Sequence, residues 1–109
     1  MNTSQAILAF SALSHETRLT VFKLLIKEGE QGLSAGVIAK QLKVQPSTLT
    51  AHLHILKRAS LIQSTRQQQK IVYSANLQGT RKLLRFLTRE CCHGHPEICA
   101  ELSDSAKVC

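Results

Sequence analysis

Sulfur chemistry is concentrated near the end of this 109-residue chain, in the stretch RECCHGHPEIC at residues 89–99. Cys91, Cys92 and Cys99 lie there together with two histidines, His93 and His95. Thiolate is a soft ligand that suits thiophilic centres, and trivalent arsenic or antimony bonds three sulfurs in a pyramid with its lone pair at the fourth corner. The three cysteines therefore predict an As(III) site, with Sb(III) as an alternative of the same chemistry.

Other uses of the thiol cluster remain open. Zinc prefers four ligands in a tetrahedron, so a histidine of the same stretch would have to join the three sulfurs. A reversible disulfide between Cys92 and Cys99 would make a redox or sulfur sensor. Nucleophilic catalysis also needs an oriented base and a cradle for the substrate, and the sequence offers no such cradle. We therefore expect a sensor and not an enzyme.

The charge distribution points to a polyanionic partner. The chain has 14 Lys and Arg against 7 Asp and Glu, for a formal charge of +7. From Gln31 to Arg89 there are ten basic residues and no acidic one. A field of one sign raises the local concentration of nucleic acid, although a basic surface can also serve solubility alone. The start, MNTSQAILAF, resembles no export signal, and no apolar run is long enough for a membrane span, so we expect a cytoplasmic protein.

Apolar spacing predicts three helices in the first half of the chain. Ala6, Ile7, Phe10 and Leu13 recur on one stripe of a helix over residues 3–13. Ser14 is a suitable cap for a second helix from about 15 to 27, which the following glycines end. A third, short helix begins behind Ser34 and is followed by a turn at residues 43–45.

The fourth predicted helix, residues 46–58, carries the residues suited to reading DNA. Pro46 fits the first helical position, which places Gln45 just outside. Leu49, Leu53 and Leu56 share one face, and the opposite face is small and polar at its start and basic at its end. A helix of this kind fits a major groove. Its outward and flanking residues are Ser47, Thr48, Thr50, Ala51, His54 and Arg58.

Beyond Leu61 the period changes to two, which predicts a hairpin with a break at residues 67–70. Its tip carries Arg66, Gln68 and Lys70, which would reach phosphates or the minor groove. A last helix over residues 80–90 places Leu83, Leu84 and Leu87 on its core side. The fold class is thus mostly α with a small β-hairpin. Residues 1–102 form one DNA-binding domain with a C-terminal thiol site, and residues 103–109 form a flexible tail.

The stretches ALSHETRLTVFKLL, QPSTLTAHLHILKRASLI and IVYSA resemble the ArsR/SmtB family of winged helix-turn-helix repressors. The resemblance covers about residues 5–77. It implies a homodimer formed by the first and last helices, which binds an operator of double-stranded DNA with an imperfect inverted repeat. It also implies release of that operator when an inducer binds.

The chain departs from the family pattern at several positions. Ala51 stands where many relatives have an arginine, and Ser60 replaces a glycine before the hairpin, so a left-handed turn there would be slightly strained. The third helix, LSAGVIAKQL, has no thiol, and TRKLLRFLTRE lacks the acid and histidine pattern of zinc-sensing relatives. His52 belongs to the motif, but we expect it to form structural hydrogen bonds because it lies on the helix flank.

Together these patterns predict a DNA-binding repressor that trivalent arsenic releases from its operator. Arsenite is the expected inducer, and antimonite and methylarsenite are further candidates. The alternatives are a repressor that switches by disulfide formation and a zinc-type metal sensor. Because the thiols stand at the end of the last helix, they converge on one atom only if that helix frays, since adjacent helical side chains diverge by about 100°.

Overall fold

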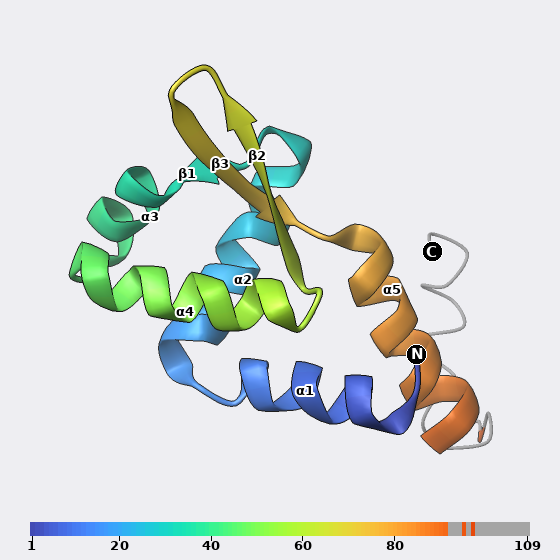
Figure 1. Cartoon of the computed structure of the whole chain (residues 1–109). Coiled ribbons are helices and arrows are strands. Elements are labelled where there is room, and N and C mark those ends of the chain that lie inside the picture. The colour runs from blue at the N-terminus through green and yellow to red at the C-terminus, as the bar shows by residue number, and fades with distance from the viewer. Residues whose placement is uncertain (92–94, 96, 98–109) are drawn as a thin grey trace.

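The computed structural model describes residues 1–91, 95 and 97. Helices pack around a small antiparallel sheet, with the hairpin projecting at one end and the last helix at the other (Figure 1). The helices are α1 (Thr3–Leu13), α2 (Glu16–Glu28), α3 (Ala35–Leu42), α4 (Pro46–Arg58) and α5 (Leu77–Arg85). The strands are β1 (Leu33–Ser34), β2 (Ile62–Gln67) and β3 (Lys70–Ala75). The winged helix-turn-helix architecture predicted from the sequence is confirmed.

The helix α1 has its predicted bounds, but its buried face is not the predicted one. Asn2 and Gln5 form a reciprocal capping box with bonds of 2.8 and 2.9 Å. The buried residues are the alanines Ala6, Ala9 and Ala12, whereas Ile7 is 62% exposed and Phe10 39% exposed. The predicted apolar stripe is therefore buried only in part, with Ala6 inside and Ile7 and Phe10 outside. Small side chains let α1 approach the body closely, which leaves the large ones outside.

The predicted cap of the second helix is also wrong, by one residue. His15, rather than Ser14, is the N-cap of α2, and its Nδ1 accepts a hydrogen bond from the Thr17 amide at 3.1 Å. Ser14 instead closes α1, since its hydroxyl donates to the Ser11 carbonyl oxygen at 2.8 Å. A serine occupied by the preceding helix cannot cap the next one in the same way.

The helix-turn-helix unit follows the sequence pattern closely. The Ser34 hydroxyl accepts from the Val37 amide at 3.4 Å and so caps α3, as predicted. Lys43 adopts a left-handed conformation, with φ of 55°, and turns the chain into α4. The helix α4 begins at Pro46, and its predicted core leucines, 49, 53 and 56, are fully buried.

The sheet contains the predicted hairpin and one strand that was not predicted. The strands β2 and β3 pair from Ile62–Ala75 to Gln67–Lys70, so the turn is shorter than the predicted break. The two-residue strand β1 pairs with β3, opposite Tyr73 and Val72, which gives the order β1-β3-β2. A Cβ at Gly32 would collide with the Tyr73 carbonyl oxygen, so this glycine permits the close approach.

The last helix begins earlier than predicted and ends differently. Asn76 caps α5 because its Oδ1 accepts from the Gly79 amide at 3.1 Å, so the helix starts at Leu77 and not at Thr80. The chain then widens into a π-helical turn over Phe86–Cys91. Leu83 is buried as predicted, but Leu84 is exposed, which contradicts its assignment to the core side.

Close packing holds the start of α5 against the turn after α4. Ser60 has φ of 62°, the left-handed conformation expected where relatives have glycine. A Cβ at Gly79 would overlap the Ser60 carbonyl oxygen, so the two backbones are in direct contact. Among the described residues no helix is both long enough and apolar enough to cross a membrane. The predicted boundary at residue 102 lies outside the described residues.

Candidate nucleic-acid interface

The reading face of α4 is fully presented to solvent. Gln45 precedes the helix, and all six predicted reading residues on α4 are exposed: Ser47, Thr48, Thr50, Ala51, His54 and Arg58. The Thr50 hydroxyl donates to the Pro46 carbonyl oxygen at 2.9 Å, so toward a base it can serve only as an acceptor. The small side chains at positions 47 and 51 allow the helix backbone to come close to base edges.

The hairpin formed by β2 and β3 extends well beyond the body of the molecule (Figure 1). Arg66, Gln68 and Lys70 are exposed at its tip, as predicted. Gln68 has φ of 57°, which is the left-handed conformation required in a two-residue hairpin turn. The tip is therefore a defined projection with two cations, suited to backbone phosphates or a minor groove.

Lys57 ties the reading helix to this hairpin, a role that the sequence did not reveal. Its Nζ donates to the Ser64 hydroxyl oxygen on β2 at 2.7 Å. The two residues are seven positions apart across a turn, and helical or strand periodicity does not report such a contact. The bond fixes the spacing between the end of α4 and the base of the hairpin.

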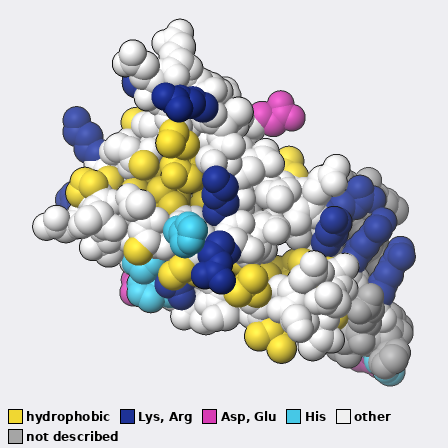
Figure 2. All heavy atoms as spheres, in the orientation of Figure 1, with side chains coloured by type: hydrophobic (Ala, Val, Ile, Leu, Met, Phe, Trp, Pro, Cys, Tyr) yellow, Lys and Arg dark blue, Asp and Glu magenta, His cyan; other side chains and the backbone are white. Residues whose placement is uncertain are grey.

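Basic side chains gather on one face of the molecule. Figure 2 shows Lys and Arg over the end of α4, on the hairpin and along α5. Within the described part of the chain, the ion pair found joins His95 to Glu97 at 3.7 Å and involves none of these Lys and Arg side chains. The four cations of the last helix, Arg81, Lys82, Arg85 and Arg89, are all exposed. A positive field of this kind steers a polyanion toward the reading face.

His52 lies on the flank of α4, and its position agrees with the structural role predicted for it. It is half-buried, and its Nδ1 is 3.3 Å from the Arg18 Nη1. Its ring contacts the ring of His15, with centroids 4.6 Å apart. Burial lowers the pKa of His52, and the charges of His15 and Arg18 lower it further.

The predicted thiol site is reached only at its first residue. Cys91 ends the π-helical turn, while Cys92 and Cys99 lie outside the described residues. Within the described residues no group of three or more His, Cys, Asp or Glu side chains is placed to hold a metal. The thiol site therefore stays a prediction.

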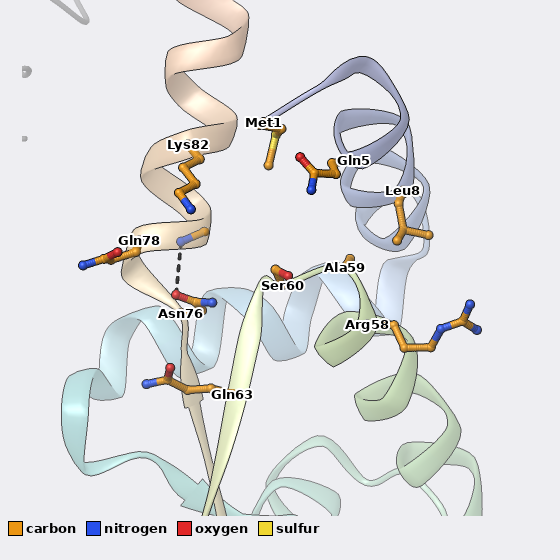
Figure 3. Close-up of a pocket in the computed structure, with 11 residues that line it drawn as sticks. Met1, Gln5, Leu8, Arg58, Ala59, Ser60, Gln63, Asn76, Gln78 and Lys82 are labelled. Carbon is orange, nitrogen blue, oxygen red and sulfur yellow. Dashed lines mark hydrogen bonds between the residues drawn. The ribbon is translucent and has the colours of Figure 1, made fainter.

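A cavity of about 540 Å³ separates the start of α1 from α5 and was not foreseen from the sequence. Figure 3 shows Gln5 and Lys82 on opposite walls, with Ser60 and Asn76 between them and Arg58 extending away. The first turn of α5 contacts the body through Ser60, and Leu83, further along the helix, belongs to the hydrophobic core.

Comparison with known proteins identifies the family. Residues 13–65 match a helix-turn-helix domain family. The chain is 39% identical to the transcriptional repressor SdpR of Bacillus subtilis over 67 aligned residues. This alignment covers 62% of this chain and 71% of SdpR. An ArsR-like transcriptional regulator from Rhodococcus sp. RHA1 has a closely similar structure, with a TM-score of 0.74, 28% identity and 89% of each chain covered. The chain belongs to the ArsR family.

Another relative spans most of the chain. The transcriptional activator HlyU of Vibrio cholerae is 24% identical over 94 residues, covering 86% of this chain and 84% of that protein. As an ArsR-family member, the chain is a DNA-binding transcriptional regulator and not an enzyme. The helix-turn-helix match ends within β2, so it includes the reading helix but not the last helix or the thiols.

Proposed function

We propose that this ArsR-family protein is a homodimeric repressor that trivalent arsenic releases from its operator. The inducer binds Cys91, Cys92 and Cys99, and the operator is an inverted repeat read by one α4 from each protomer. The observation that carries the proposal is the presence of three thiols within nine residues, beginning at Cys91, the last residue of the π-helical turn that follows α5. Arsenite is the simplest inducer, and antimonite and methylarsenite share its affinity for thiolates.

The exposed apolar side chains support the dimer. Ile7, Leu8 and Phe10 on α1 and Leu77 and Leu84 on α5 are all exposed. Clustered large apolar side chains on the surface mark interaction sites. A mycobacterial winged-helix domain of 23% identity and TM-score 0.64 is described as homodimeric. We infer that α1 and α5 cover each other's apolar faces across a two-fold axis in this chain as well.

The structure suggests how a thiol site at the end of α5 would control DNA binding. The first turn of α5 lies against Ser60, next to the end of the reading helix, and Leu83 anchors the helix to the core. Gathering three sulfurs around one arsenic atom ties down the chain beyond α5 and changes how the two α5 helices pack. If the two α4 helices then no longer fit successive major grooves, operator affinity falls. A hundredfold loss corresponds to a coupling free energy of about 2.7 kcal/mol.

Arsenite titration of operator binding tests the proposal. The operator is obtained by selecting binders from a pool of random duplexes, and the dissociation constant is measured by fluorescence anisotropy. Arsenite is expected to weaken binding about a hundredfold for the wild-type protein and for Cys109→Ser, which serves as the matched control. The variants Cys91→Ser, Cys92→Ser and Cys99→Ser are expected to stay bound.

Alternative inducers in the same assay discriminate the competing sensors. Release by peroxide but not by arsenite would contradict the arsenic site and support disulfide switching between thiols. Release by zinc alone would support a tetrahedral site completed by a histidine. A selected duplex without two-fold symmetry would contradict the dimeric reading of an inverted repeat.

A further inference from the structure

Arg18 on α2 contacts the end of one helix and the middle of another. Its Nε donates to the Ala12 carbonyl oxygen at 2.7 Å, and its Nη2 donates to the Ser11 carbonyl oxygen at 3.4 Å. Its Nη1 lies 3.3 Å from the Nδ1 of His52 on α4. One partly buried guanidinium therefore joins the C-terminal end of α1 to the recognition helix.

The chemistry of the guanidinium fixes the state of its histidine partner. Arginine has only donors and stays protonated, so His52 must accept at Nδ1 and carry its proton on Nε2. The positive charge also suits the end of α1, where carbonyl groups form the negative pole of the helix. The contact with His52 therefore exists only while that imidazole is neutral.

His15 holds the imidazole of His52 from another side. The two rings are tilted by 42° with centroids 4.6 Å apart. His15 is itself fixed, because its Nδ1 accepts from the Thr17 amide as the cap of α2. The imidazole of His52 is thus held between a guanidinium and a second ring, next to the exposed Ala51 on the reading face.

We propose that Arg18 is a positioning residue for DNA recognition, which sets the orientation of α4 relative to α1 through the neutral imidazole of His52. The inference rests on the DNA-binding function of the family and not on the arsenic site. Because α1 also carries exposed apolar side chains, the same contact links the surface expected to form the dimer to the helix expected to read the operator.

Protonation of His52 breaks the contact. It places an N–H where Arg18 needs an acceptor and adds a cation next to Arg18. Burial, then His15 and then Arg18 lower the pKa of His52 below its usual value of about 6.5. Since the pKa is lowered on folding, the contact contributes fully above that usual value and is lost as pH falls through the lowered one.

Among the described residues, no other charged side chain is seen to contact His52 as Arg18 does. The helix α1 has no charged residue, and within the described residues no carboxylate pairs with His52. The further charged or titratable groups on α4 itself and on the elements packed against it are Glu16, Lys23, Lys27, Glu28, Lys40, His54, Lys57, Arg58 and Arg66.

The first test compares Arg18→Met with Lys27→Met, which removes the same charge from an exposed position on the same helix. Binding to the selected duplex is measured by anisotropy at pH 7.5 without arsenite, after circular dichroism has verified folding. The Arg18→Met variant is expected to bind about tenfold more weakly than the Lys27→Met variant, since hydrogen bonds from a charged group are among the stronger ones. Equal affinities of the two folded variants would overturn the proposal.

The second test separates positioning from mere stability and does not need an Arg18 variant to fold. The His52→Asn variant offers Arg18 a carbonyl oxygen near the position of Nδ1 but does not titrate. Between pH 8 and pH 5.5, the wild-type protein is expected to lose affinity progressively relative to this variant, by less than about tenfold at the acid end. His54 is present in both proteins, so its effect cancels in the ratio.

A ratio that stays constant with pH would overturn the proposal, as would a wild-type protein that gains affinity relative to the variant in acid. The latter would show that protonated His52 contacts a phosphate. Failure of the wild-type protein to select any duplex would instead refute DNA binding, and the arsenite assay remains a separate test of the inducer.

Discussion

The recognition helix α4 and the first helix α1 teach opposite lessons about how an amino-acid pattern specifies burial. In α4 the leucines recur at helical spacing and all three predicted core positions are fully buried. In α1 the large apolar residues also recur at helical spacing, but alanines fill the core while Ile7 and Phe10 face outward. Apolar periodicity shows that a face avoids water, and it does not show whether the covering partner is the same chain or another.

The largest contrast is expected in stability. Leu53 is fully buried in α4, and replacing it with alanine removes core contacts and leaves a cavity. The Leu53→Ala variant is expected to lose about 2–5 kcal/mol of unfolding free energy, the usual cost of such a truncation. Urea unfolding at a fixed protein concentration measures the change. A loss below about 1 kcal/mol would show that this face of α4 is not the core of the protomer.

Substitutions on the exposed apolar face of α1 are expected to weaken dimerisation and not the stability of the protomer. The Ile7→Asp variant places a charge on the apolar surface that we assign to the dimer and is expected to raise the dimer dissociation constant by at least about 30-fold, as for a hot-spot residue. Analytical ultracentrifugation measures this, with Gln41→Asp as the control at an exposed position of α3, outside the apolar face of α1. If both variants dimerise equally well, the apolar face of α1 is not part of the dimer.

The hairpin tip sharpens the distinction between contacts that position the protein and contacts that read bases. Arg66→Ala should weaken binding to every duplex and reduce the slope of log affinity against log salt by about one unit per protomer, because one phosphate contact is lost. Titrations at several salt concentrations measure the slope. The Lys27→Ala variant serves as the control and is expected to keep the wild-type slope. If the Arg66→Ala variant also keeps that slope, the tip does not contact phosphate.

A smaller change in unfolding free energy is expected at Ser60, where the backbone conformation and not side-chain packing determines stability. Ser60 adopts φ of 62°, which costs an L-residue free energy that glycine does not pay. The Ser60→Gly variant is therefore expected to gain up to about 1 kcal/mol in unfolding free energy, offset in part by its more flexible unfolded chain. Thermal unfolding of both variants measures the change in unfolding free energy. The control variant Ser64→Gly, on β2, is expected to lose stability, whereas Ser60→Gly is expected to gain it.

The sequence was sufficient wherever a local signal has one structural meaning. Pro46 marks the start of α4, Ser34 caps α3, and the change of period after Leu61 marks the hairpin. The remaining features depend on contacts between distant residues. The strand β1 has only two residues and shows no alternation, and it exists because β3 offers a free edge.

The predicted start of the last helix was wrong for a related physical reason. The apolar pattern of the last helix does not extend back to Asn76, because Leu77, the first helical residue, is exposed and does not share the buried face. The pattern therefore does not indicate that Asn76 is the cap. At the interface, the exposure of all ten predicted DNA-contacting residues could be inferred from helical and hairpin geometry. The bonds from Lys57 to Ser64 and from Arg18 to His52 could not, since they join different elements.

The coupling between the thiols and the reading helices is tested most directly by measuring how operator DNA changes the affinity of the protein for arsenite. Equilibrium dialysis of arsenite against the free protein and against its complex with the selected duplex gives two affinities for the inducer. Thermodynamic linkage requires operator DNA to weaken arsenite binding by the same factor, about a hundredfold, by which arsenite weakens operator binding. Equal arsenite affinity in the presence and absence of the duplex would contradict the account.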